Sequence, residues 1–171
     1  MLTQFWQIKD ELQLATLAVA IVLGLWRGAG PERTCAAIYL GMWLGDRLYH
    51  LVSNGIVVLG GADLGHIAID AVTAGGLIGV ALYANRNYPL WLASMQLVSL
   101  LSHFLRIISP SIDPTAYALL AASPMYLAVL IFAVGLSRHL RRQKRHGPYR
   151  SWRGSSPRNA EPCWPTLSPS G

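Results

Sequence analysis

Long apolar runs alternate with short polar links along most of this chain. The apolar runs cover five segments, namely residues 12–26, 34–52, 64–83, 89–108 and 115–137. A helix needs roughly 17 to 25 mostly apolar residues to cross the hydrocarbon core of a bilayer. Because a backbone in lipid must satisfy its own hydrogen bonds, runs of this length predict helices rather than strands. The pattern predicts an all-α integral membrane protein with a five-helix transmembrane bundle in residues 1–137. Whether the first and shortest segment spans fully is left open.

The links carry residue types that end helices. They contain the stretches RGAGPER, SNGIVVLGGAD, ANRNYP and SPSIDP, in which glycine, proline, asparagine and aspartate are frequent. Pro89 stands where the first turn of a helix tolerates proline, and Asn87 before it is a candidate cap. The links therefore separate the five predicted helices.

Lys and Arg are distributed unevenly among the links. The first link holds Arg27 and Arg33 and the third holds Arg86, whereas the second and fourth hold neither residue type. Cytoplasmic loops of membrane proteins carry the excess of Lys and Arg. With five spans, this alternation predicts a cytoplasmic C-terminus and an N-terminus outside. A bacterial inner membrane is the expected location, because the links are short and no eukaryotic sorting signal occurs.

The composition is typical of a membrane protein and not of a soluble one. Of the 171 residues, 53% are hydrophobic and only 13% are charged, whereas an average soluble domain is about 25% charged. The formal net charge is +6, and most of the excess sits in residues 138–153. Residues 138–171 are expected to form a basic, largely disordered cytoplasmic tail, because they are rich in Pro, Ser and Gly. Nucleic-acid binding is not expected, since few aromatic residues interleave with the basic ones.

The first part of this tail directly follows a predicted membrane helix. A basic residue in such a position gains about 1 kcal/mol from an anionic leaflet. We therefore expect contact with anionic lipid at five positions: Arg138, Arg141, Arg142, Lys144 and Arg145.

Ionisable residues gather in one half of the predicted membrane. Seven of them lie toward the outer ends of three predicted helices: Asp46, Arg47, His50, His66, Asp70, His103 and Arg106. With a rise of about 1.5 Å per residue, Asp46 lies roughly 10 Å below the outer edge. Asp46 and His50 are four residues apart, as are His66 and Asp70, so each pair shares one face of its helix. Because a charge that faces lipid costs several kcal/mol, these faces should turn inward and converge.

Two interpretations of this group remain open. Ion pairs can simply hold helices in register, and Arg47, His66 and Arg106 can reach the headgroups from near a helix end. Alternatively, the group binds or relays a ligand, with six candidate ligand- or proton-binding residues: Asp46, His50, His66, Asp70, His103 and Arg106. The histidines His50, His66 and His103 also outline a metal or haem site, although HExxH, CxxCH and a Cys-rich cluster are absent. No cofactor is expected.

The leading functional hypothesis is a small membrane protein that binds or translocates a small solute or a proton. The alternative is a non-catalytic accessory subunit of a larger membrane complex, whose helices associate through pairs such as Gly41 with Gly45 and Gly75 with Gly79. A metal- or haem-binding membrane protein is the third hypothesis. Catalysis is not favoured, because neither GxSxG nor a phosphate-binding glycine loop occurs. Homo-oligomerisation is compatible with the first two hypotheses.

Overall fold

The computed structural model describes residues 2–52, 58–59, 62–109, 111–147 and 151–153. The helices in these ranges are α1 (Leu2–Arg27), α2 (Gly30–Val52), α3 (Leu64–Tyr83), α4 (Tyr88–Ile108) and α5 (Pro114–His146). A short antiparallel hairpin joins β1 (Val58–Leu59) to β2 (Ala62–Asp63) between α2 and α3. The predicted helical architecture is therefore confirmed.

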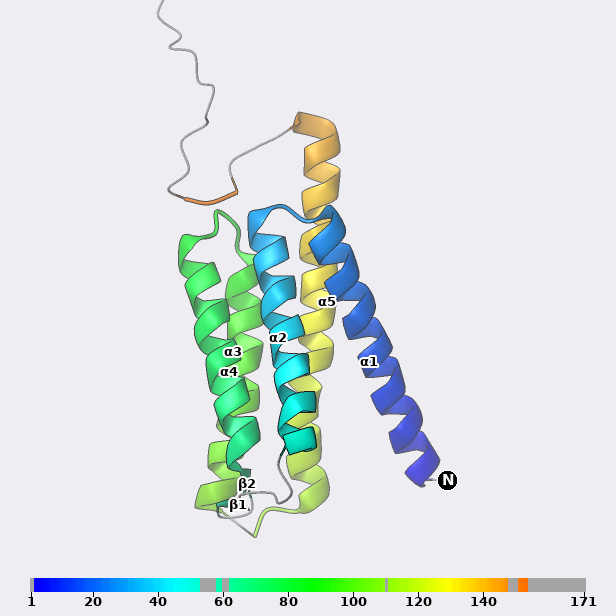
Figure 1. Ribbon diagram of the computed structural model, residues 1–171, viewed down its shortest axis with the longest axis vertical. Coiled ribbons are helices and arrows are strands. Elements are labelled where there is room, and N and C mark those ends of the chain that lie inside the picture. Colours follow the sequence, from blue (N-terminus) through cyan, green and yellow to red (C-terminus); the bar gives the residue numbers. More distant parts are fainter. Residues whose placement is uncertain (1, 53–57, 60–61, 110, 148–150, 154–171) are drawn as a thin grey trace, which may run out of the picture.

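Helices α2 to α5 run side by side as a bundle, and α1 leans against it (Figure 1). Helix α3 contacts α2 and α4, α4 contacts α5, and α1 contacts both α2 and α5. The start of α1 diverges from the other helices (Figure 1). We call the end that carries the β-hairpin and the α4–α5 link the hairpin end. The opposite end, with the α3–α4 link and the last turns of α5, is called the tail end.

Three helices are long and apolar enough to cross a membrane: Leu64–Tyr83, Tyr88–Ile108 and Thr115–Arg145. Only 28% of each apolar window is buried inside the protein. The other side chains of these windows keep some exposed surface, which lipid can solvate. Helix α2 is also long, but four charged residues lower its hydropathy: Glu32, Arg33, Asp46 and Arg47. The apolar part of α1, Leu14–Arg27, is short. That α1 and α2 cross the membrane therefore remains a prediction, as does the orientation of the protein in the membrane.

Several helix ends lie beyond the ends of the apolar runs. Helix α1 begins at Leu2, α2 begins at Gly30 and α5 continues to His146, whereas the runs themselves begin at 12 and 34 and end at 137. Arg, Lys and Gln are good helix formers, so a helix can continue after its apolar run has ended. Helix α5 stops where Gly147 adopts a φ of 71°, a left-handed conformation that favours glycine. Asn87 occupies the N-cap position of α4, but its side chain makes no capping hydrogen bond.

The hydrophobic core receives side chains from every helix. Its members include Leu17, Ile21, Tyr39, Leu77, Leu92 and Phe132. Helices α1 and α5 meet closely at Gly24, where an added Cβ would lie 2.7 Å from the ring of Phe132. Small residues permit this approach between membrane helices. Gly41, Gly75 and Gly79 instead face open space, with no atom within 4 Å of an added Cβ, so these three glycines do not serve close packing among the described helices.

The tail end is tied together by a buried ion pair and a returning segment. Glu32 at the start of α2 pairs with Arg86 in the α3–α4 link. The backbone N–H of Asn85 donates to the carbonyl of Ser151 at 3.1 Å, and Trp152 packs against Gly30. Residues 148–150 and 154–171 lie outside the described part of the chain, so the disorder expected for most of the tail remains a prediction.

Candidate functional site

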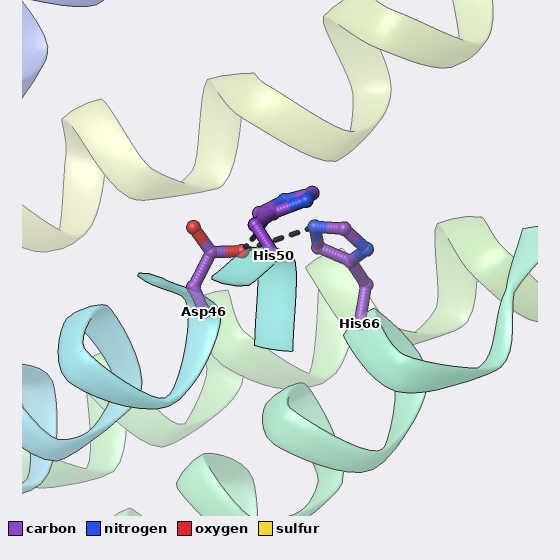
Figure 2. A group of neighbouring side chains, drawn as sticks. All are labelled: Asp46, His50 and His66. Atoms are coloured by element: carbon purple, nitrogen blue, oxygen red, sulfur yellow. Dashed lines mark ion pairs between the residues drawn. The ribbon is translucent and has the colours of Figure 1, made fainter. Parts of the chain in front are cut away.

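Three of the predicted site residues meet near the hairpin end and form what we call the rim cluster: Asp46, His50 and His66. Figure 2 shows Asp46 and His50 on α2 and His66 on α3. Oδ1 of Asp46 lies 3.0 Å from Nε2 of His66 and 3.7 Å from Nε2 of His50. One ligand atom from each residue lies within 4.8 Å of the others. All three side chains remain between one third and one half exposed, so an ion from solution can reach them.

A second carboxylate lies behind His66. Oδ2 of Asp63 is 3.0 Å from Nδ1 of His66, the ring nitrogen that faces away from Asp46. Oδ1 of Asp63 accepts hydrogen bonds from the Tyr49 hydroxyl at 2.7 Å and from the backbone N–H of Gly65 at 2.8 Å. Burial acts to raise the pKa of Asp63, but these hydrogen bonds and the contact with His66 hold it below its ordinary value. Asp63 therefore stays ionised and fixes the orientation of the His66 ring.

The local sequence explains why these groups meet. Asp46 and His50 lie one turn apart on the same face of α2, and the register Val58↔Asp63 of the hairpin returns the chain beside the end of that helix. Asp63 then serves as the N-cap of α3. The close approach requires glycine at position 65, because an added Cβ would lie 2.3 Å from the ring of Tyr49.

Asp70 and His103 form a second group, which we call the inner cluster. Oδ2 of Asp70 on α3 lies 3.2 Å from Nε2 of His103 on α4. Gln96 donates to Oδ1 of Asp70 at 2.9 Å, and the Ser99 hydroxyl donates to Oδ2 at 3.2 Å. The other ring nitrogen of His103 lies 2.8 Å from the hydroxyl of Tyr117 on α5. The inner cluster is thus a nearly saturated hydrogen-bond network that links three helices.

Asp70 borders two cavities. A cavity of about 310 Å³ is lined by Asp46, His66 and Asp70, and its other walls are mostly apolar. A smaller cavity of about 180 Å³ lies against Asp70, Gln96 and Ser99 and reaches Pro124 of α5. The two clusters are therefore neighbours, and Asp70 lies between the first cavity and the second.

The two arginines of the predicted group make other contacts, and Arg106 reaches the edge of the inner cluster through the ring of Tyr117. The guanidinium of Arg106 donates to the carbonyl of Ile112 in the α4–α5 link and lies 5.5 Å from the ring centroid of Tyr117. The guanidinium of Arg47 lies 5.7 Å from the ring centroid of Trp43 on the same helix. The structure thus brings together five of the six candidate residues in two groups and places Arg106 in a helix-linking contact.

The rim cluster supplies the donor atoms that divalent transition metals prefer. Histidine nitrogens and carboxylate oxygens bind Zn²⁺ and similar ions through bonds of about 2.0–2.2 Å, which separates neighbouring donor atoms by about 3.3 Å. The contacts of 3.0 and 3.7 Å in the cluster lie on either side of this spacing. A metal-binding histidine also commonly donates its second ring N–H to a carboxylate, as His66 can do to Asp63. Of the three predicted metal ligands, His50 and His66 are joined by Asp46, while His103 belongs to the inner cluster.

Comparisons with known proteins provide no independent indication of function, because no family model, no curated protein and no solved structure matches this chain.

Some residues around the two clusters were not among those predicted from the sequence. Asp63 lies just before an apolar run, a position that signals an N-cap. Spacing along the chain gives no such indication for Tyr49 or Tyr117, which reach the clusters across helix contacts.

Proposed function

We propose that this protein is a small membrane protein that binds a divalent transition-metal cation at Asp46, His50 and His66. The observation that carries the proposal is the convergence of three donor atoms from two helices within 4.8 Å. Asp63 adds support as a carboxylate that holds His66 by its other ring nitrogen. Two histidines and one carboxylate leave coordination positions open for water or a second ligand. In the predicted orientation the site faces the outside of a bacterial inner membrane.

Cobalt(II) is a suitable probe, because it occupies zinc-type sites and its visible absorption reports the coordination geometry. The full-length protein in mild detergent near neutral pH should bind one Co²⁺ per chain and develop bands of a four- or five-coordinate ion. Zn²⁺ should displace the Co²⁺ and remove these bands. Histidine ligands must be neutral to bind a metal, so the affinity should fall as the pH is lowered.

Matched variants decide whether the metal occupies the rim cluster. His66→Ala should abolish the Co²⁺ bands, because it removes the ligand that contacts Asp46 at 3.0 Å. His103→Gln is the control, since it also removes a histidine that pairs with an aspartate but lies in the inner cluster. Equal binding by wild type and His66→Ala would contradict the proposal.

Translocation of the cation, or of a proton in exchange, is the second part of the proposal. It is supported by the position of Asp70, which borders the cavity beside Asp46 and His66 as well as the cavity beside Gln96. In proteoliposomes that contain a metal-sensitive dye, Asp70→Asn should abolish uptake and leave Co²⁺ binding at the rim intact. Unchanged uptake in this variant would exclude Asp70 from the path, and an absence of uptake by the wild type would limit the function to binding.

An accessory or oligomeric role is a second candidate function. It is favoured by a groove of about 500 Å³ between α2 and α3, which is lined by small residues that include Gly41, Gly45 and Gly76. Small residues let a further membrane helix approach closely. Native mass spectrometry of extracted protein should then find a stable dimer or a heterologous partner, and Gly41→Leu should dissociate it. A monomer under the mildest extraction would exclude this role.

A further inference from the structure

The tail end contains a groove, and no residue of the rim cluster or the inner cluster lines it. It has a volume of about 610 Å³ and lies between the α3–α4 link and α5. Its polar lining consists of Asn85, Arg86, Asn87, Arg138, His139 and Arg142. Its remaining walls are formed by residues such as Trp91, Leu130, Ile131 and Val134. One wall is therefore basic and polar, and the other is apolar.

The basic wall and the apolar wall of the groove follow each other along one face of α5. Leu130, Val134, Arg138 and Arg142 are each four residues apart, so they form a continuous stripe on the helix. The stripe is apolar toward the middle of the predicted membrane and basic toward its surface. Tyr88 covers Gly135 beside this stripe, where an added Cβ would lie 2.6 Å from the Tyr88 ring.

The polar side of the groove is lined by basic residues. Arg86 pairs with buried Glu32, and Arg138 and Arg142 add two further basic side chains to the lining of the groove. Arg138 and Arg142 have exposed side chains. An anion beside them would gain charge-assisted hydrogen bonds, and arginine is well suited to bind the oxygens of a phosphate.

We propose that this groove binds one anionic glycerophospholipid, with its phosphate at Arg138 and Arg142 and an acyl chain along Leu130 and Val134. A lipid fits better than a free phosphate ion, because the apolar wall continues directly from the basic end. Basic pockets between membrane helices at the cytoplasmic side commonly bind lipid headgroups. The site lies at the opposite end of the bundle from the rim cluster and does not depend on metal binding there.

The same helical turns provide a matched control. Arg141 and Lys144 are exposed basic residues of α5, but they do not line the groove. If the protein were only attracted to an anionic membrane surface in general, loss of any of these four charges would weaken lipid binding to the same extent. Of these four residues, only Arg138 and Arg142 should matter for a defined site in the groove.

The test is native mass spectrometry of the full-length protein titrated with phosphatidylglycerol, phosphatidylcholine of the same acyl chains, or inorganic phosphate. Wild type should retain one phosphatidylglycerol per chain in preference to phosphatidylcholine. The double variant Arg138→Gln/Arg142→Gln should bind it at least about tenfold more weakly, because two favourable charge contacts are lost. The control Arg141→Gln/Lys144→Gln should bind like wild type.

A second variant tests the apolar wall without changing the charge. Val134 is partly exposed in the groove, so Val134→Trp fills the space assigned to the acyl chain and should also displace the lipid. Circular dichroism verifies that each variant keeps its helices. Equal losses in the two double variants, or a specific adduct with inorganic phosphate alone, would overturn the proposal.

Discussion

The rim and inner clusters use the same pair of residue types in different surroundings. Each combines an aspartate with a histidine from a neighbouring helix. The side chains of Asp70 and His103 are only 16% and 11% exposed, whereas those of Asp46 and His66 are both 35% exposed. In the inner cluster, Gln96, Ser99 and Tyr117 occupy the remaining hydrogen-bonding positions. Among the described residues, Asp46 pairs only with the two histidines.

This difference indicates a division of roles. A buried polar group that has all its partners contributes to a unique packing of helices, and removal of one member leaves the others unsatisfied. A polar group at an exposed rim contributes little to stability, because water can replace its partners. Its incomplete coordination instead leaves atoms available for a ligand. The inner cluster is therefore expected to stabilise the bundle in addition to the translocation role proposed for Asp70, and the rim cluster is expected to bind the metal ion.

The largest expected effect comes from removing the two aspartates in turn. Asp70→Ala should lower the free energy of unfolding by about 3 kcal/mol, since Gln96, Ser99 and His103 lose a buried acceptor. Asp46→Ala should cost less than about 1 kcal/mol, because the pair is partly exposed. Thermal unfolding in detergent, followed by circular dichroism, measures both values. Similar losses in the two variants would remove the distinction between the clusters.

The next effect concerns Asp63, the positioning residue behind His66. In Asp63→Asn, an amide N–H₂ facing Nδ1 would favour the tautomer that carries its proton on Nε2, the nitrogen that should bind the metal. We expect the affinity for Co²⁺ to fall about 10- to 100-fold, the range typical of lost carboxylate partners of metal ligands. Helix capping should persist, because asparagine is also a good N-cap. An unchanged affinity would show that His66 needs no such partner.

Two glycines of α3 test the packing around the rim cluster. Gly65→Ala should destabilise the protein by about 1–3 kcal/mol, the usual cost of overpacking, because the new Cβ would collide with the ring of Tyr49. It should also weaken Co²⁺ binding by displacing Asp63. Gly75→Ala is the control on the same helix, where a Cβ meets open space, and it should stabilise α3 by about 0.5–1 kcal/mol. Thermal unfolding of both variants gives the comparison, and a stabilising Gly65→Ala would contradict it.

The length of an apolar run predicted the bounds of a helix well where the same residue limits both the run and the helix. The predicted range 64–83 coincides with α3, because Asp63 caps the helix where the apolar run begins. The apolar run in α5 ends at Ser137, but good helix formers carry the helix on to His146. Hydropathy thus located the end of the apolar surface and not the end of the helix.

Helical spacing predicted the site only in part. It placed Asp46 and His50 on one face, and they do lie together. It also placed His66 and Asp70 on one face, yet they join different clusters, because His66 lies beside Asp46 of α2 and Asp70 lies beside His103 of α4. Arg106 shares a face with His103 by spacing, but the carbonyl of Ile112 in the following link is within reach of its guanidinium. Such partners depend on the packing of links and cannot be read from one helix.

The smallest expected effect compares two capping aspartates. Asp63 caps α3 and also contacts His66, whereas Asp113 caps α5 through hydrogen bonds from the backbone N–H groups of Ala116 and Thr115. These bonds hold the pKa of Asp113 below its ordinary value of 3.8. Its contribution to stability is therefore present above that value and is lost as the pH falls through the lower folded pKa.

Asp113→Asn keeps a capping oxygen but cannot titrate. The difference in melting temperature between wild type and this variant should thus be larger at pH near neutral than below the ordinary pKa of 3.8. The effect should be small, because Asp113 is exposed. Co²⁺ binding should stay at the wild-type level, in contrast to Asp63→Asn. A pH-independent difference in melting temperature would contradict the role of Asp113 as an ionised cap, and a loss of Co²⁺ would show that the α4–α5 link also supports the rim cluster.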